Sequence, residues 1–172
     1  MILITVLRHL FAIAVLPFTV TVLIPIWIAR NNHTTFSIAK SPGELLVRFA
    51  GAALLTIGLA LFIASLRRFA TEGKGTLAPW DPPKHLVVRG PYRYVRNPMI
   101  SGVIFILCAE ALILRSVPHG WWAVTFFLAN LTWIPLWEEP WLRDRFGDPY
   151  REYCRHVRRF VPRLRPWQPD QR

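Results

Sequence analysis

Four long stretches of the sequence are rich in apolar residues, and strongly basic segments lie between them. A helix needs about 20 residues, within a range of about 17–25, to cross the hydrocarbon core of a bilayer, and each stretch reaches that range. The chain is 53% hydrophobic and yet carries a formal net charge of +11, which is unusual for a soluble basic protein. The pattern predicts an all-α polytopic membrane protein with about four transmembrane helices, at residues 2–28, 45–66, 98–114 and 121–137.

The basic residues are distributed unevenly among the connecting segments. Residues 67–97 and 138–172 hold seven and nine of the 21 lysines and arginines, whereas residues 30–44 and 115–120 together hold three. Basic connecting segments of membrane proteins lie mostly on the cytoplasmic side. We therefore expect both termini to be cytoplasmic, in the cytoplasmic membrane of a bacterium. We expect these basic segments to interact with a lipid bilayer and not with nucleic acid.

Local signals predict where two of the helices begin. Ser41 precedes a proline and is followed by Glu44, which is the spacing of a capping box. Asn97 precedes Pro98, so we expect a helix that begins at Pro98 with Asn97 as its N-cap. The free N–H groups and the positive dipole end of that helix would face a pocket lined by Arg93 and Arg96, which is an anion site. A basic loop that touches lipid headgroups is the alternative interpretation.

The apolar stretches also contain features that predict their packing. The first stretch resembles a signal peptide, but the lack of a small-residue cleavage site before Arg30 favours a retained helix, kinked at Pro17 and Pro25. In the second stretch, Gly51 and Gly58 belong to a face of small residues suited to close helix packing.

The third and fourth apolar stretches are joined by a short segment, so they must form an antiparallel hairpin over residues 98–137. We expect residues 116–120 to form a tight turn and Glu110 to pair with Arg115 at the membrane interface. The chain is expected to be one membrane-embedded domain. Its parts are an N-terminal two-helix part at 1–66, a core at 67–163 and a tail at 164–172.

The two ends of the hairpin bring charged residues of opposite sign together. Asn97 and Glu138 lie at those ends, so the sequence places Arg93 and Arg96 beside Glu138 and Glu139 on the cytoplasmic side. One interpretation is structural, with the carboxylates pairing with the arginines to hold the hairpin together. The other is a mixed-charge pocket for a zwitterionic ligand, with carboxylates for an ammonium group and arginines for a carboxylate.

The C-terminal segment contains nine arginines and a predicted amphipathic helix. Gly147 should end one helix, and Asp148 followed by Pro149 should begin the next. The last helix should lie on the membrane surface or fold back over the basic loop, because its apolar residues recur with helical spacing, at Tyr150, Tyr153, Cys154 and Val157.

Two blocks of sequence carry a resemblance to a known family. The first is Gly-Pro-Tyr-Arg-Tyr-Val-Arg-Asn-Pro-Met-Ile-Ser-Gly at residues 90–102. The second begins with Glu-Glu-Pro-Trp-Leu at 138–142 and continues with Phe146-Gly147, Tyr150, Tyr153 and Phe160-Val-Pro162. Together, over about residues 72–163, they resemble the isoprenylcysteine carboxyl methyltransferase and phospholipid methyltransferase family of integral membrane enzymes.

The resemblance implies S-adenosylmethionine as the cofactor. The cofactor-binding residues implied by the resemblance are Tyr94, Arg96, Asn97, Pro98, Gly102, Glu138 and Glu139. Two more residues of the basic loop, His85 and Tyr92, are candidates for the same pocket. Arg96, Glu139 and Tyr153 are the candidate catalytic residues. No metal site is expected, because the five histidines lie far apart without the spacing of metal ligands.

The nature of the methyl acceptor is left open by these residues. A phospholipid amine is the first choice, and a small hydrophobic thiol, phenol or carboxylate, including a prenylcysteine-like one, is the second. Asn97 and Ile100 stand where the carboxyl methyltransferases carry His and Tyr, which argues against a prenylcysteine. Two other classes remain as alternatives: a non-catalytic protein that binds anionic lipid, and a relative of the membrane reductases that binds a nicotinamide cofactor.

Overall fold

The computed structural model describes residues 14–73 and 84–168, and these residues form helices and loops without a β-strand. The predictions for residues 2–13 of the first stretch and for the middle of the long basic connection lie outside the described residues. The helical segments are, in order, η1 Ala14–Leu23, α2 Ile24–Asn31, α3 Pro42–Arg68, η2 Phe69–Gly73, η3 Gly90–Arg93, α4 Pro98–Leu114, α5 Val117–Trp133, η4 Ile134–Glu138, α6 Glu139–Phe146 and α7 Asp148–His156.

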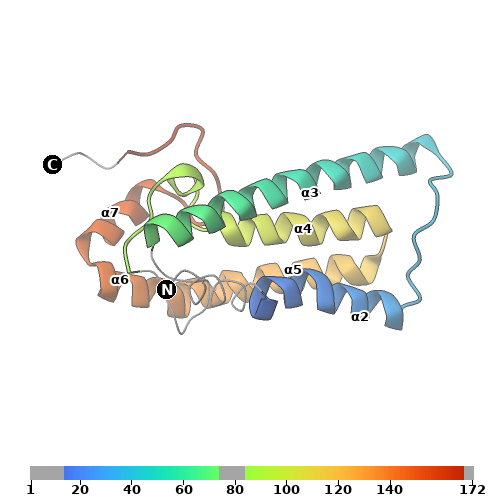
Figure 1. The fold of residues 1–172 in the computed structure, drawn as a ribbon, viewed down its shortest axis with the longest axis horizontal. Helices are drawn as coiled ribbons and strands as arrows, with labels where there is room; N and C mark the ends of the chain where they lie inside the picture. Colours follow the sequence, from blue (N-terminus) through green and yellow to red (C-terminus); the bar gives the residue numbers. More distant parts are fainter. Residues whose placement is uncertain (1–13, 74–83, 169–172) are drawn as a thin grey trace.

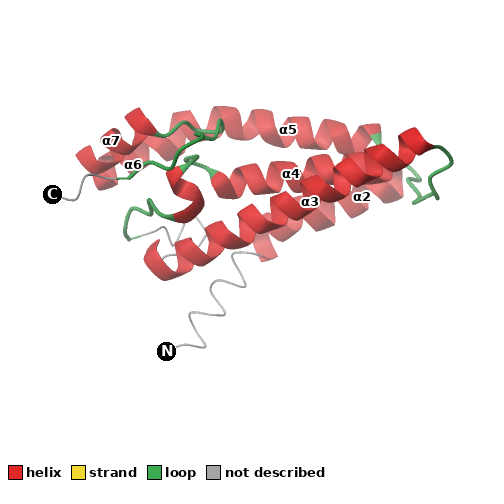
Figure 2. Ribbon diagram, turned by 90° about the horizontal axis from the view of Figure 1, so that it is seen from above, coloured by secondary structure: helices red, strands yellow, loops and turns green. Residues whose placement is uncertain are grey.

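Helices α3, α4 and α5 and the continuous segment of η1 and α2 lie lengthwise beside one another (Figures 1 and 2). The connection between α2 and α3 crosses one end of this bundle, while α6, α7 and the segment around η3 gather at the other end. Pro17, which is expected to kink the first stretch, lies in the π-helical segment η1, and Pro135 lies in the π-helical segment η4. Pro25 instead lies in the first turn of α2, where its missing N–H group is not needed.

Helix α3 begins as its sequence predicts. The hydroxyl of Ser41 accepts a hydrogen bond from the Glu44 N–H group at 3.2 Å. The reciprocal bond differs from a standard capping box, because the Glu44 carboxylate accepts from the N–H group of Lys40 at 2.8 Å. Helix α4 has the predicted bounds, but the Asn97 side chain makes no capping hydrogen bond. Its amide group turns to the Arg159 carbonyl instead, at 3.5 Å.

Helices α3 and α4 pack closely against each other through glycines. A Cβ atom added at Gly58 would lie 2.8 Å from the Gly102 carbonyl oxygen, and one added at Gly102 would lie 2.8 Å from that of Gly58. A Cβ atom added at Gly51 would likewise lie 2.8 Å from the Cγ1 atom of Ile113 in α4. The predicted face of small residues is therefore the contact with α4, and the two backbones approach as only glycine allows.

Two predictions for the far end of the hairpin are wrong. Residues 116–120 are not a tight turn, because α5 already begins at Val117 and His119 is buried in it. Arg115 pairs with Glu44 at 2.6 Å and not with Glu110. Arg115 adopts a left-handed conformation with φ 50° after α4, and the antiparallel packing of α3 brings the start of α3, and so Glu44, to this end.

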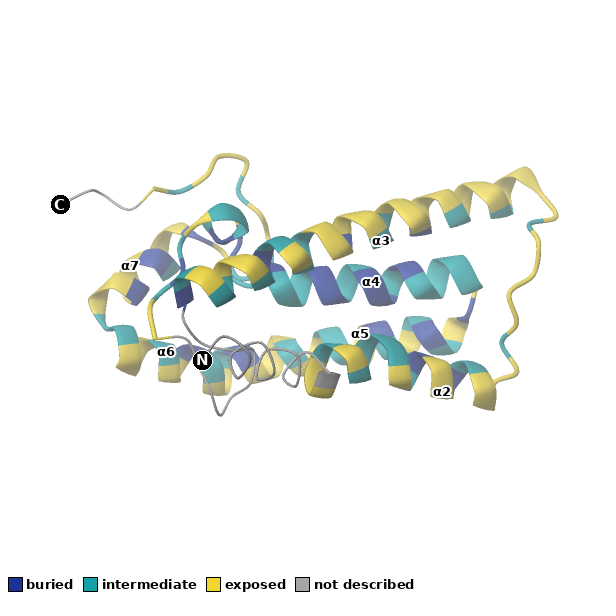
Figure 3. Ribbon diagram, in the orientation of Figure 1, coloured by how far each residue is buried: buried dark blue, intermediate teal, exposed yellow. Residues whose placement is uncertain are grey.

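One helical span is long and apolar enough to cross a membrane by length and composition. It covers Pro42–Gly73, which has 32 residues and contains an 18-residue window with a mean hydropathy of 2.2. Two shorter apolar helices cover Val15–Asn31 and Pro98–Leu114. The outward face of the long span is exposed (Figure 3) and carries large apolar side chains such as Leu46 and Phe49. A bilayer would cover such a face.

Candidate functional site

The basic loop is joined by backbone hydrogen bonds to the segment that follows α7. The N–H group of Arg96 donates to the Arg158 carbonyl at 2.9 Å, and the N–H group of Arg163 donates to the Tyr94 carbonyl at 2.9 Å. Farther along, the N–H group of Trp167 donates to the Arg93 carbonyl at 3.0 Å. Of the two predicted placements for the C-terminal segment, folding back over the loop is therefore the one observed, and it extends into the predicted tail.

The apolar face of α7 packs against the basic loop and holds it in this position. Tyr150, Tyr153 and Val157 are buried together, as their spacing predicts, and they pack against Leu86 and Val88 of the loop among other residues. The Tyr153 hydroxyl donates to the Tyr92 carbonyl at 2.6 Å. Burial raises the pKa of Tyr153, so its hydroxyl stays protonated and holds the loop.

Glu139 is the centre of the charged cluster at this end of the bundle. It is only 3% exposed, and its carboxylate accepts hydrogen bonds from Arg159 at 2.7 and 3.0 Å. Arg96 lies 3.1 Å and Arg143 3.5 Å from the same carboxylate. Burial alone would raise the pKa of Glu139, but the hydrogen bonds from Arg159 and the charges of Arg96 and Arg143 outweigh it and lower the pKa.

Arg96 connects this ion cluster to α7 and keeps one donor free. One terminal nitrogen of its guanidinium lies on Glu139, and the other donates to the Cys154 sulfur at 2.6 Å. Its Nε atom is buried and has no hydrogen-bond partner within the described part of the chain. A buried donor without a partner is costly, so it is a position where a ligand oxygen would be stabilised.

Glu138 has surroundings quite unlike those of Glu139. Among the described residues it has neither a hydrogen bond nor an ion pair, although it is partly buried. Burial and the neighbouring Glu139 charge raise its pKa. Burial raises the pKa of Tyr92, and the nearby negative charge of Glu138 raises it further. The site therefore contains one carboxylate saturated by arginines and one that is free to accept.

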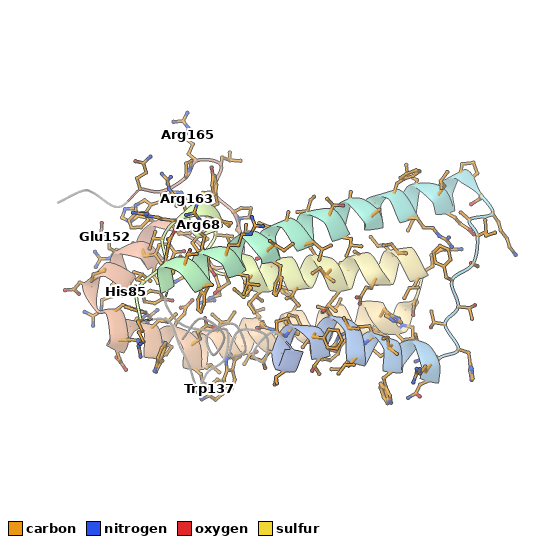
Figure 4. The ribbon with its side chains drawn as sticks, viewed as in Figure 1. Arg68, His85, Trp137, Glu152, Arg163 and Arg165 are labelled. Carbon is orange, nitrogen blue, oxygen red and sulfur yellow. The ribbon has the colours of Figure 1, made fainter. Side chains whose placement is uncertain are left out.

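The remaining predicted site residues divide into two groups. Pro98 and Gly102 are buried in α4, and Gly102 faces α3. His85 and Tyr94 are exposed on the loop. The backbone N–H group of His85 donates a hydrogen bond to the Gly73 carbonyl at 3.3 Å. In Figure 4, His85 lies at the same end of the bundle as Arg68, Glu152 and Arg163.

Sequence reasoning missed Arg159 and Cys154 as neighbours of Arg96. Both lie on or after α7, among nine arginines of similar surroundings in the sequence, so no local pattern distinguishes Arg159. The apolar face of α7 places Cys154 near the loop, and this is the one signal that could have identified it.

These features define a helical protein with an exposed apolar bundle and a buried charge cluster at one end. A family model described as phospholipid methyltransferase matches residues 46–149, which is more than half of the chain. The chain belongs to this family of membrane methyltransferases. The match includes the loop, the hairpin and both glutamates, whereas Tyr153 and Arg159 lie beyond it. No curated protein and no solved structure matches the chain.

Proposed function

We propose that this protein is an integral membrane methyltransferase that uses S-adenosylmethionine and methylates an acceptor dissolved in the membrane. The observation that carries the proposal is that, among the residues the structure describes, the Glu138 carboxylate has no hydrogen-bond or ion-pair partner. Arg96 lies at the same end of the bundle, and its buried Nε donor has no partner in that part of the chain either. The family membership supports methyl transfer as the reaction.

The residues present fit the cofactor. S-Adenosylmethionine carries an ammonium group, a carboxylate and ribose hydroxyls. Glu138 would accept from the ammonium group or from ribose hydroxyls. The Nε atom of Arg96 and the first N–H groups of α4, which Asn97 leaves uncapped, would hold the carboxylate.

When bound, the cofactor supplies an electrophilic methyl group on a sulfonium. Glu139 keeps Arg96 in place through a charge-assisted contact, with Arg159 on the same carboxylate. Tyr153 holds the Tyr92 carbonyl and so orients the loop. Arg96, Glu139 and Tyr153 thus serve as binding and positioning groups, and their contribution to rate is alignment and exclusion of water.

A phospholipid amine is the acceptor that we favour, and a small hydrophobic thiol, phenol or carboxylate is the second choice. The exposed apolar surface of α3 and the stacked pair Trp133 and Trp137, 4.9 Å apart, support entry of the acceptor from the bilayer. We also propose four membrane spans, formed by the first stretch, α3, α4 and α5. Both termini and the site would then face the cytoplasm of a bacterial cell.

Calorimetric titration of the purified protein tests the cofactor assignment. S-Adenosylmethionine and its demethylated product should bind to one site, and NADPH should not bind. Binding of NADPH alone would favour a relative of the reductases. A lack of binding for all three would favour a non-catalytic protein that binds anionic lipid, and either result would overturn the proposal.

A further inference from the structure

A shallow cavity lies on the outer side of the charge cluster. It has a volume of about 320 Å³ and is lined by Arg143 of α6 and by Arg151, Cys154 and Arg155 of α7. The three α7 residues have the spacing of one helix face, which adjoins the face of the buried Tyr150 and Tyr153. Two helices therefore direct three guanidinium groups to one hollow.

The positive charge of the cavity is only partly neutralised by the residues that the structure describes. No carboxylate from the described ranges lines it. Arg143 shares Glu139 with Arg96 and Arg159, and Arg151 has only the exposed Asp148 at 3.2 Å. Arg155 makes no hydrogen bond or ion pair with any residue that the structure describes. Within the described ranges, the ion pairs made by these arginines and by Arg96 and Arg159 involve only two carboxylates, Glu139 and Asp148.

Arginine clusters of this kind match the chemistry of a phosphate. The planar guanidinium donates two parallel hydrogen bonds to a phosphate, and several arginines on one anion offset its desolvation. The cavity is also next to the candidate site, because Cys154 in its wall accepts the hydrogen bond from Arg96. The aromatic pair Trp133 and Trp137 lies just before α6 and is typical of the level of lipid headgroups.

We propose that this cavity binds a phosphate group, from a phospholipid headgroup or from a soluble phosphate. The inference goes beyond the proposed methyl transfer and does not depend on it, since it rests on the arginines and the cavity alone.

The test is calorimetric titration of the full chain in a neutral detergent with two probes. Dihexanoylphosphatidylglycerol represents the lipid, and inorganic phosphate represents the soluble anion. The double variant Arg151→Gln/Arg155→Gln should bind both probes at least about tenfold more weakly than the parent. Arg143 is left unchanged because it also contacts Glu139.

The matched control is Arg145→Gln/Arg165→Gln, which removes the same charge at two exposed residues that do not line the cavity. It should change binding by less than about twofold, as expected of distant surface charges. Equal weakening by both double variants would reduce the effect to net charge and would overturn the proposal. So would an absence of binding to the parent, or equal binding by the parent and the cavity variant.

The two probes also distinguish the source of the phosphate. Tighter binding of the lipid than of inorganic phosphate assigns the site to a headgroup, and equal binding assigns it to a soluble phosphate. Titration of the same proteins with S-adenosylmethionine separates this inference from the proposed function. The cavity variant should keep the parent's cofactor affinity, and a parent that binds phosphate but not the cofactor would contradict only the proposed function.

Discussion

Glu138 and Glu139 are adjacent in the chain and face opposite electrostatic surroundings. Glu139 accepts two hydrogen bonds from Arg159 and lies 3.1 Å from Arg96, whereas Glu138 has no such bond among the described residues. Glu138 ends η4 and Glu139 begins α6, so one step along the helix turns them in different directions. This division separates a structural role from a binding role, and the two can be measured independently.

Glu139→Gln should destabilise the protein. The change leaves Arg96 and Arg159 without their shared carboxylate in a largely buried cluster, which typically costs about 3–5 kcal/mol. The measurement is the thermal midpoint in detergent. Asp144→Asn, an exposed acidic change in the same helix, is the control and should alter stability by less than about 0.5 kcal/mol. Equal midpoints for the parent and Glu139→Gln would show that the cluster does not support the fold.

Glu138→Gln should have the opposite profile. It removes a partly buried carboxylate beside Glu139 that has no hydrogen bond or ion pair with the described residues, so stability should be unchanged or slightly higher. Cofactor affinity should fall by about ten- to a hundredfold, since losing a charge-assisted hydrogen bond costs about 1.5–3 kcal/mol. Calorimetry on the folded variant measures this. An unchanged affinity for S-adenosylmethionine would remove Glu138 from the proposed pocket.

Acidification should reveal the contribution of Glu139. Its pKa in the folded protein is lower than the ordinary value of 4.5, so its stabilising effect is present above that value. The effect is lost as pH falls through the lowered pKa, because the folded state must then take up a proton that the unfolded state already holds. The thermal midpoint of the parent should therefore drop in this range more steeply than that of Glu139→Gln. Parallel pH curves would contradict the assignment.

Gly58→Ala should destabilise the protein by overpacking the contact between α3 and α4. The added Cβ would lie 2.8 Å from the Gly102 carbonyl oxygen and 3.0 Å from the Ile106 nitrogen, and both are backbone atoms. Overpacking of this kind costs about 1–3 kcal/mol. Gly120→Ala in α5 is the control, since nothing lies within 4 Å, and alanine should stabilise that helix by about 0.5–1 kcal/mol. A lower midpoint for Gly120→Ala than for Gly58→Ala would be inconsistent with the packing described.

Parts of the fold could be predicted from local sequence signals, whereas most long-range contacts could not. The bounds of α4 follow from Pro98 at its start and from the charged Arg115 after its end. The burial of His119 was missed because Pro118 and Gly120 indicate a turn, although a proline is tolerated in the first turn of a helix.

The pairing of Arg96 with Glu139 was predicted from the hairpin topology. Arg93 was predicted to lie beside the same glutamates, but its Nε atom donates to the Trp167 carbonyl at 2.8 Å instead. Which of the two glutamates stays free depends on helix rotation and on Arg159, and neither is visible in a local pattern.

The partition of labelled product between phases tests the central claim most directly. Membranes that contain the protein are supplied with S-adenosylmethionine radiolabelled in its methyl group, and the products are extracted into lipid and aqueous phases. Membranes with the Glu138→Gln variant are the control. We predict label in the lipid phase that depends on the parent protein and is strongly reduced in the variant. Label found only in water-soluble molecules would contradict the lipid acceptor, and no protein-dependent label in either phase would contradict methyl transfer itself.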